Sequence, residues 1–395
     1  RGLAPRIREV SAAYGLALDP DRLVGTLSAG ERQRVEIVRC LLQEPRFLIM
    51  DEPTSVLTPQ EVDMLFATLR KLAAEGVAIL YISHKLEEIR ALCDRATILR
   101  GGRVVATCRP REETAKSLAE MMIGAALAPQ AEKAHRIGAT LLEVDGLSLP
   151  ASGPFGTPLR DIAFTLRRGE ILGIGGIAGN GQEELLAALS GERSSPPGAI
   201  RLDGRPIGGR APNARRALGL LAAPEERLGH AAAPEMSLTE NALLTGLVRQ
   251  RLASGGFIKW EATSNFARAI VKAFDVRTAG VGHAARSLSG GNLQKFVMGR
   301  EMLQRPAILA VNQPTWGVDA AAAAAIRSAL VRLAAEGAGV IVISQDLDEL
   351  MEISDRFAVL AAGRLSAPRP AGALSVDEIG LMMGGQSREV LHAAS

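Results

Sequence analysis

Two carboxylates stand side by side after an apolar run, an arrangement that suits metal-assisted chemistry on a phosphate. The run from Phe47 to Met50 is followed at once by Asp51 and Glu52. An Asp at a strand end suits holding Mg²⁺ beside nucleotide phosphates, and the following Glu suits polarising an attacking water. His84 follows a second apolar run, residues 77–83, and suits hydrogen bonding to a γ-phosphate. We therefore predict Asp51, Glu52 and His84 as catalytic residues, with Asp51 as the Mg²⁺ ligand.

A turn of small residues opens a predicted helix at two places in the chain. Such a turn offers a hydroxyl and backbone N–H groups at a helix N-terminus, a geometry that binds anions. The first turn consists of Ser28, Ala29 and Gly30, and the second consists of Ser289, Gly290, Gly291 and Asn292. A lone turn of this kind is more often a simple helix cap. Two of them, each placed before an equivalent strand, indicate a nucleotide-binding role.

The chain repeats itself at a spacing of 261 positions, the distance from Ser28 to Ser289. Asp51-Glu52-Pro53-Thr54 matches Asn312-Gln313-Pro314-Thr315, and Ile82-Ser83-His84 matches Ile343-Ser344-Gln345. A match that persists over about a hundred residues indicates a duplicated domain rather than a solenoid repeat. In the second copy Asn312, Gln313 and Gln345 replace the acid, the base and the imidazole, so we expect only one copy to perform acid–base chemistry.

The second copy also contains a glycine-rich loop between a predicted strand, residues 169–174, and a predicted helix, residues 183–190. A loop in this position places backbone N–H groups and a helix N-terminus around a phosphate. Its residues are Gly176, Gly179, Gly181, Gln182 and Glu183. Gln182 stands where such loops carry Lys and Glu183 where they carry Ser or Thr. A carboxylate about 4 Å from a phosphate charge costs roughly 4 kcal/mol at an effective dielectric of about 20, so we expect weak Mg-ATP binding there.

The elements that position these residues alternate between strand and helix. We predict strands at 308–311 and 339–344, helices at 292–303 and 320–336, and a mainly helical stretch at 237–286. This alternation predicts an α/β fold with a mostly parallel sheet and helices on its faces, so functional residues should lie at the C-terminal strand ends.

Both halves of the chain resemble ATP-binding cassettes of the ABC transporter superfamily. The matching features are the turns at Ser28 and Ser289, the Asp51-Glu52 strand end, the loop at residues 55–58, and His84. A closer resemblance is to tandem-cassette subunits of bacterial importers for simple sugars and nucleosides, and it is carried by residues 30–37, 51–61, 179–182 and 224–227. The resemblance implies two P-loop NTPase-type cassettes, each with a helical subdomain, and ATP and Mg²⁺ as cofactors.

In this family two cassettes pack head to tail, so each ATP lies between the phosphate loop of one cassette and the serine turn of the other. The resemblance therefore implies that Ser289, Gly290, Gly291 and Asn292 serve the catalytic residues in trans. The degenerate site would combine Gly176, Gly179, Gly181, Gln182, Glu183, Asn312, Gln313 and Gln345 with Ser28, Ala29 and Gly30. Glu225 stands where the family's Q-loop residue contacts the γ-phosphate and the membrane subunit, so it has an implied coupling role.

The resemblance also sets domain boundaries. We predict the C-terminal part of a first cassette at 1–124, a linker at 125–140, a second cassette at 141–385 and a tail at 386–395. The counterpart of Leu141 would lie before Arg1, so we expect roughly 120 residues of the first cassette to precede this sequence. We therefore expect the chain as printed to be inactive alone.

Composition restricts the class of protein. The net charge is +3, and no long run of Lys or Arg occurs, so nucleic-acid binding is not indicated. Cys40, Cys93 and Cys108 lack the paired spacing of a zinc site or a disulfide framework. No run of eighteen or more apolar residues occurs. The resemblance, in turn, implies a peripheral protein on the cytoplasmic face of the cell membrane, whose partners are integral membrane permease subunits and, indirectly, a solute-binding lipoprotein or periplasmic protein.

Two alternatives remain open at this point. One is a soluble twin-cassette ATPase without a transport role, which copurification with a permease would distinguish. The other is a dinucleotide-binding oxidoreductase, because residues 173–178 match the pattern G-x-G-x-x-A after a strand. A comparison of ATP and NAD binding would distinguish that class.

Overall fold

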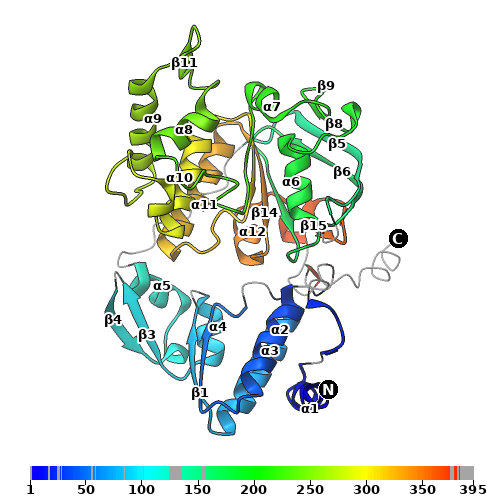
Figure 1. Cartoon of the computed structure of the whole chain (residues 1–395), viewed down its shortest axis with the longest axis vertical. Coiled ribbons are helices and arrows are strands. Elements are labelled where there is room, and N and C mark those ends of the chain that lie inside the picture. Colours follow the sequence, from blue (N-terminus) through cyan, green and yellow to red (C-terminus); the bar gives the residue numbers. More distant parts are fainter. Residues whose placement is uncertain are drawn as a thin grey trace. The chain divides into compact units, whose positions relative to one another are not determined.

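The computed structural model describes residues 2–16, 18–24, 27, 29–54, 57, 59–83, 85–100, 102–123, 136–153, 156–373, 378–379 and 382. The chain forms two compact units (Figure 1). Unit 1 comprises residues 1–129 with 376–395, and unit 2 comprises residues 130–375. The two-cassette boundaries predicted above stay a prediction, since the proposed linker lies largely outside the described residues.

Unit 1 contains a parallel strand pair and an antiparallel hairpin. The pair is β1 (Phe47–Asp51) with β2 (Ala78–Ile82), and the hairpin is β3 (Ala96–Arg100) with β4 (Arg103–Cys108). Its helices are α1 (Leu3–Ala13), α2 (Ala29–Leu41), α3 (Pro59–Ala74), α4 (Leu86–Leu92) and α5 (Ala115–Ile123), and a short 3-10 helix spans Pro110–Glu112. The core of this unit joins α2 and α3 to one face of β1, where Leu48 and Met50 are buried.

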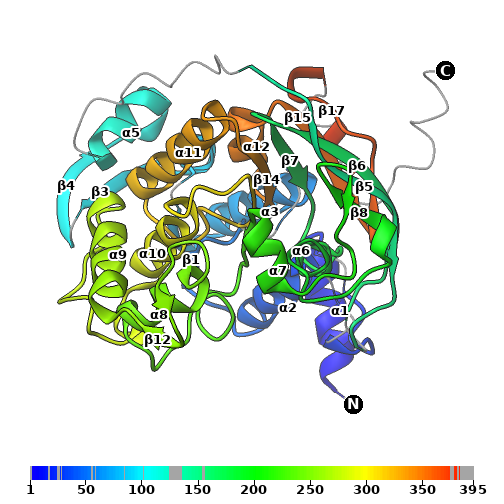
Figure 2. The same cartoon turned by 90° about the horizontal axis from the view of Figure 1, so that it is seen from above.

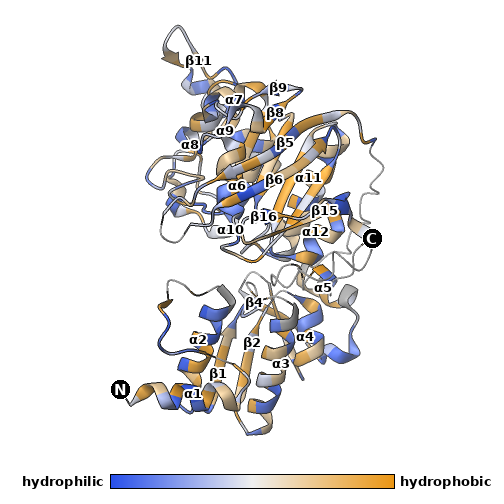
Figure 3. Ribbon diagram, turned by 90° about the vertical axis from the view of Figure 1, so that its right-hand side faces the viewer, coloured by the Kyte–Doolittle hydropathy of each residue, from blue (hydrophilic) through white to orange (hydrophobic). Residues whose placement is uncertain are grey.

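The other face of the β1–β2 pair is open within unit 1. Both strands consist mostly of apolar residues (Figure 3), and Phe47 and Ile49 are 56% and 58% exposed. Their counterparts in unit 2, Ile308 and Ala310, are fully buried in a core that contains residues of helix 182–190. The duplicated strands therefore have the same sequence pattern but different coverage.

Unit 2 is built on a larger sheet with the strand order β10-β13-β14-β7-β15-β16, and β17 pairs with β15. The first five strands are parallel, as predicted, and β16 and β17 run antiparallel. Their bounds are β10 Leu220–Ala223, β13 Ile308–Asn312, β14 Gly339–Ser344, β7 Ile171–Gly175, β15 Arg356–Ala361, β16 Arg364–Leu365 and β17 Arg369–Pro370. β7, β13 and β14 are buried along their whole length because both faces of the sheet are covered.

A second, antiparallel sheet has the order β6-β5-β8-β9. Its strands are β5 (Thr140–Leu149), β6 (Leu159–Arg167), β8 (Ile200–Leu202) and β9 (Arg205–Pro206), and a small hairpin is formed by β11 (Ala253–Ser254) and β12 (Phe257–Ile258). Seen from above, β5, β6 and β8 lie along one side of unit 2, and helices α8 and α9 lie along the other (Figure 2).

Most helices of unit 2 lie in the predicted ranges with small shifts at their ends, whereas α7 and α12 were not predicted. The helices are α6 (Gln182–Ser190), α7 (Pro212–Leu218), α8 (Leu238–Gly246), α9 (Trp260–Ala273), α10 (Gly290–Met302), α11 (Ala320–Ala335) and α12 (Leu347–Ile353). Short 3-10 helices span Pro197–Ala199, Ala285–Ser287 and Ala371–Ala373. α8 begins with a complete capping box, in which Ser237 and Glu240 satisfy each other's backbone N–H groups.

Candidate functional site

The glycine-rich loop of unit 2 lies between β7 and α6, but a side chain closes it. The Gln182 side chain is buried, its Nε2 donates to the Ile177 carbonyl at 2.7 Å, and its Oε1 accepts from the Asn180 amide at 3.0 Å. The Asn180 Nδ2 also donates to the Ile177 carbonyl, at 3.0 Å. The backbone N–H of Asn180, which could donate to a phosphate, therefore donates to a side chain of the loop itself.

The same loop depends on glycine where the side chain of Gln182 crosses it. A Cβ atom at Gly176 would lie 2.6 Å from both the Gln182 Nε2 and the Leu360 carbonyl oxygen. Gly181 has φ 111° at the N-cap of α6, in the left-handed region that favours glycine. The backbone turn of a phosphate loop is thus present, but the side chain that lies across it is the neutral amide of Gln182 instead of a cation. These residues do not fit a triphosphate as they stand.

Two amides and a carboxylate lie at the neighbouring strand ends. Asn312 ends β13, is almost fully buried, and donates from Nδ2 to the Glu225 Oε2 at 3.3 Å. Burial, and then the charge of Glu183, raise the pKa of Glu225. The sheet thus brings Glu183, Glu225 and Asn312 together, as the strand-end prediction required. Two carboxylates facing the loop oppose a bound phosphate through charge repulsion.

Gln313 adopts the same strained backbone as its counterpart in unit 1. Gln313 has φ 53° and Glu52 has φ 46°, and their amides donate to the carbonyls of Ile343 and Ile82 at 2.8 and 2.9 Å. Left-handed φ values are uncommon for residues other than Gly, Asn and Asp and are found at functional sites. The geometry of a catalytic strand end is therefore kept in unit 2, although the carboxylate is not.

In unit 1, Asp51 ends β1 with an exposed side chain, and Glu52 follows it in an intermediate environment. Carboxylate oxygens are the ligands that Mg²⁺ prefers, so the Asp51 side chain fits the predicted metal. Ser28 and His84 lie outside the described residues, and their predicted roles stay predictions. Ala29 and Gly30 form the start of α2.

The second serine turn lies at the exposed start of α10. Ser289 is the N-cap of α10, but its hydroxyl makes no cap hydrogen bond and instead accepts from the Asn292 Nδ2 at 2.9 Å. Asn292 Oδ1 accepts from the Arg277 amide at 2.8 Å, so both polar ends of this side chain are used. Ser289 and Gly290 face solvent in unit 2. The turn is consequently available to a group outside its own unit.

Arg227 connects three loops of this site. Its guanidinium donates to the Trp316 carbonyl and lies 5.6 Å from the centre of the Trp316 ring. The guanidinium also occupies the space beside Gly290 and Gly317, where a Cβ atom would lie 2.9 and 3.1 Å from its nitrogens. The turn after β10, the serine turn and the loop after β13 therefore share one side chain.

Removing this guanidinium should change the environment of Trp316. In a Trp260→Phe background, where Trp316 is the only tryptophan, we expect Arg227→Ala to shift its fluorescence to longer wavelength. The free energy of unfolding should fall by about 0.5–1 kcal/mol, the range of a partly exposed cation–π contact. Arg227→Lys should give an intermediate result because it keeps the charge and loses the planar fork. Identical emission spectra in all three proteins would contradict the contact.

Glu349, near the start of α12, is a titrating group that contacts Ser344, the last residue of β14. It is buried, its Oε2 accepts from the Ser344 hydroxyl at 2.9 Å, and its Oε1 accepts no hydrogen bond from the described residues. Burial, and then the charge of Asp346, raise the pKa of Glu349 to about 7. Between about pH 4.5 and 7 the folded state therefore keeps a proton that the unfolded state has lost. The free energy of unfolding should consequently fall as the pH rises through this range.

We expect Glu349→Gln to remove this part of the pH dependence. The free energies of unfolding of wild type and variant should differ by an amount that changes by up to about 3 kcal/mol from pH 4.5 to 8, since each unit of pKa shift corresponds to 1.36 kcal/mol. Urea unfolding at several pH values measures it. Parallel stability curves for the two proteins would show that Glu349 titrates normally.

Comparison with known proteins decides what kind of site this is. A family described as ABC transporter matches residues 4–55 and 159–316, more than half of the chain. The chain belongs to the ABC transporter family. It is thus an ATP-binding protein of a family of ATPases, so the G-x-G-x-x-A pattern at residues 173–178 does not indicate a dinucleotide-binding oxidoreductase. The predicted fold class is confirmed.

Similar proteins are ATP-binding proteins of importers. A glucose import ATP-binding protein of Haloferax volcanii is 37% identical over 96% of this chain and 70% of its own length. A nucleoside import ATP-binding protein of Lactococcus lactis is 37% identical over 97% of this chain and 76% of its own length. A ribose import ATP-binding protein of Geobacillus kaustophilus is 36% identical over 89% and 70%.

Solved structures confirm the cassette fold. A crystal structure of an archaeal ribosome recycling factor in complex with a ribosomal stalk protein matches 92% of this chain and 68% of that chain, with a TM-score of 0.63 and 22% identity. A structure titled as the ATP binding subunit of an ABC transporter covers 62% of this chain and its own whole length, with a TM-score of 0.50 and 22% identity. These likenesses concern the fold alone.

Sequence reasoning assigned no role to three residues of this ABC cassette, Arg227, Glu349 and Gln294. Arg227 lies in the segment 224–227 that carries the family resemblance, and Gln294 is buried and donates to the Pro314 carbonyl at 2.9 Å. A usable signal existed only for Arg227, which follows Glu225 and Glu226 in the turn after β10. The contacts of Arg227 and Gln294 involve partners far away in the sequence, whereas Glu349 accepts from Ser344, five residues earlier.

Proposed function

We propose that this chain is the ATP-hydrolysing subunit of an ABC importer for nucleosides or simple sugars. The observation that carries the proposal is the 35–37% identity, over most of the chain, to ATP-binding proteins of nucleoside, ribose and glucose import. The transported solute would not touch this chain, so the choice between a nucleoside and a sugar rests on these relatives.

We propose further that the two ATP sites of the assembled cassettes are unequal. The competent site combines Asp51, Glu52 and His84 with the turn Ser289, Gly290, Gly291 and Asn292. In it Asp51 would hold Mg²⁺, which would offset phosphate charge, and Glu52 would orient and deprotonate the attacking water. The support for this assignment is the exposed Asp51 carboxylate and the solvent-facing serine turn.

The degenerate site has a structural or regulatory role in this proposal. It combines Gly176, Gly179, Gly181, Gln182, Glu183, Asn312, Gln313 and Gln345 with Ser28, Ala29 and Gly30. The Gln182 hydrogen bonds across the loop and the Glu183–Glu225 pair both disfavour a nucleotide there. Glu225 would couple this site to the membrane subunit, since its carboxylate bonds Asn312 and the turn that carries it reaches the serine turn through Arg227.

The partners follow from the same proposal. None of the described helices is both long and apolar enough to cross a membrane. The import relatives support integral permease subunits as partners. We place the chain at the cytoplasmic face of the membrane, with a solute-binding lipoprotein or periplasmic protein acting indirectly and with no nucleic acid bound.

Uptake measurements test the importer assignment. Deleting the gene should abolish high-affinity uptake of one radiolabelled nucleoside or simple sugar, and a plasmid copy should restore it. A plasmid copy carrying Glu52→Gln should fail to restore uptake. Unchanged nucleoside and sugar uptake in the deletion strain would exclude the proposed cargo, while copurification with ribosomes instead of a permease would favour the soluble twin-cassette class.

A further inference from the structure

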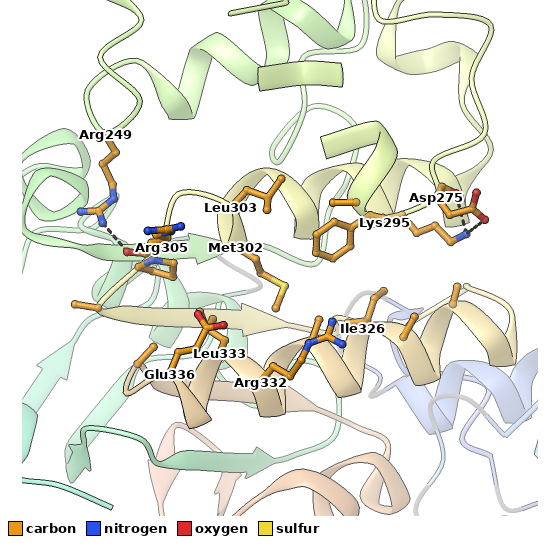
Figure 4. Close-up of a pocket in the computed structure, with 18 of the residues that line it drawn as sticks. Arg249, Asp275, Lys295, Met302, Leu303, Arg305, Ile326, Arg332, Leu333 and Glu336 are labelled. Carbon is orange, nitrogen blue, oxygen red and sulfur yellow. Dashed lines mark hydrogen bonds and ion pairs between the residues drawn. The ribbon is translucent and has the colours of Figure 1, made fainter. Parts of the chain in front are cut away.

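A groove of about 1200 Å³ runs between α10 and α11 in unit 2 (Figure 4). We call it the α10–α11 groove. Its lining includes Gly219 and Ala307 at the N-terminal ends of β10 and β13, the opposite strand ends from those that carry Asn312 and Gln313. This groove is therefore not part of the nucleotide-binding residues described above. Its volume exceeds that of most small-molecule pockets and suits a stretch of polypeptide.

The groove combines an apolar middle with basic residues. Met302 of α10 points toward α11, where Ile326 and Leu333 line the groove (Figure 4). Its basic side chains are Arg168, Arg249, Arg277, Lys295, Arg305 and Arg332, and its acidic side chains are Asp275, Asp319 and Glu336. An occupant should therefore offer apolar surface together with a net negative or neutral polar edge.

Unit 1 shows what lies at the equivalent position there. Tyr14 is the first residue after α1, and Phe274 is the first residue after α9. The backbone amide of each donates to the carbonyl four residues earlier. The next residues, Gly15 and Asp275, both have positive φ, at 69° and 47°. Tyr14 and Phe274 are thus equivalent in the two units.

In unit 1, Thr68 and Lys71 of α3 and Glu75, directly after this helix, hold Tyr14. The Thr68 hydroxyl donates to the Tyr14 carbonyl at 2.9 Å, and the Tyr14 hydroxyl donates to Glu75 at 2.7 Å. Lys71 donates to the Ala13 carbonyl at 2.7 Å, and its Nζ lies 4.9 Å from the centre of the Tyr14 ring. A cation and a carboxylate one helical turn apart thus both contact the Tyr14 side chain.

Unit 2 keeps a cation and a carboxylate at the corresponding positions but has no tyrosine there. By the repeat spacing, Arg332 replaces Lys71 and Glu336 replaces Glu75, whereas Ala329 replaces Thr68. Phe274 has no hydroxyl and packs instead toward α10, where a Cβ at Gly299 would lie 2.5 Å from its ring. Among the described residues, the side chains of Arg332 and Glu336 make no hydrogen bond or ion pair with each other or with a third group.

We propose that the α10–α11 groove is the docking site for a segment of a partner protein that presents a tyrosine. Its ring lies against Arg332, its hydroxyl donates to Glu336, and the preceding main-chain carbonyl accepts from Arg332, as in the arrangement of Tyr14 in unit 1. Arg277 and Arg305 of the groove favour acidic residues beside that tyrosine. The groove accommodates a helical segment, in the mode in which amphipathic helices dock.

The chain itself supplies a probe for this site. A fluorescein-labelled peptide with the sequence of residues 3–16, in which Arg6 and Arg8 are replaced by Gln so that Glu9 is its one charged side chain, is titrated with the full chain, and binding is followed by fluorescence anisotropy. We expect saturable binding that weakens about three- to tenfold when the peptide tyrosine is replaced by Phe, the range of one net hydrogen bond. Glu336→Gln should weaken the tyrosine peptide to a similar extent and leave the Phe peptide unchanged, because both changes remove the same bond.

Matched variants locate the binding. Arg332→Ala, at an exposed side chain, should weaken both peptides, while Lys71→Ala in unit 1 should weaken neither. Sensitivity to Lys71→Ala but not to Arg332→Ala would mean that the peptide replaces α1 in unit 1, and would overturn the proposal. Far-ultraviolet circular dichroism establishes that each variant is folded.

Other occupants give distinct results. If the residue that follows α9 occupies the groove instead, Phe274→Tyr will raise the free energy of unfolding only when Glu336 is present, and it will prevent peptide binding. If the occupant is a lipid, the chain will sediment with phosphatidylglycerol vesicles, Arg305→Ala and Arg332→Ala will prevent it, and no peptide will bind. Either outcome, or equal affinity for the tyrosine and Phe peptides, would overturn the proposal. None depends on ATP turnover, so the proposed importer function stands or falls separately.

Discussion

Glu52→Gln is expected to lower ATP turnover of the assembled transporter by about 10²–10⁴-fold, the contribution of a general base. The substitution keeps the size of the side chain and removes only its ability to take a proton from water. Gln313→Ala, at the equivalent position of unit 2, should leave turnover within about twofold because that residue already lacks a carboxylate. Release of phosphate from membrane vesicles containing the permease measures both effects.

The asymmetry can be tested further with the reverse substitution. Gln313→Glu restores a carboxylate at a strand end with the same left-handed backbone as Glu52. We expect it to leave turnover unchanged, because the Gln182 bonds across the phosphate loop remain. Equal losses from Glu52→Gln and Gln313→Ala would show that both sites hydrolyse ATP, and our assignment of one competent site would be wrong.

The second large effect concerns the phosphate loop of unit 2. We expect the double substitution of Gln182→Lys and Glu183→Thr to strengthen Mg-ATP binding to the chain by at least about a hundredfold. A lysine places a cation at the loop, and removing the Glu183 carboxylate relieves a repulsion of roughly 4 kcal/mol at a separation of about 4 Å. The same change lowers the charge around Glu225.

Titration with a fluorescent ATP analogue, with and without Mg²⁺, measures this gain. Gln182→Ala serves as the matched control, since it breaks the hydrogen bonds to Ile177 and Asn180 but adds no positive charge. It should have much less effect than the double substitution. Tight Mg-ATP binding by the wild-type chain would contradict the closed loop, and an unchanged affinity in the double variant would contradict its electrostatic explanation.

The strands and helices of unit 2 were largely predictable because their signals are local. Apolar runs ending in polar residues predicted β13 and β14, and the pair Ser237 and Glu240 predicted the start of α8. Elements with weak local signals were missed, namely α7, α12 and the β11–β12 hairpin within the stretch predicted as mainly helical, and other errors lay at element ends. For example, α10 begins at Gly290 rather than at Asn292, since the serine turn itself forms the first turn of the helix.

The candidate site was predictable as a set of residues but not as a geometry. The repeat alone identified Asn312 and Gln313 as amides in place of Asp51 and Glu52, and parallel strands bring such residues to one sheet edge. The loss of the phosphate-loop lysine was equally visible. That Gln182 turns back onto Ile177 and Asn180 was not, because side-chain direction depends on neighbours that periodicity does not specify.

The sequence by itself determined the family, the duplication and the chemical inequality of the two copies, because each depends only on residue identity and spacing. Tertiary structure alone decided that Arg227 joins Trp316 to Gly290, that the pKa of Glu349 rises, and that the groove beside Arg332 stays open while Tyr14 is gripped in unit 1. The physical reason is the same in each case. Contacts, burial and electric fields arise between segments that folding brings together, and two copies with one pattern can pack the same position differently.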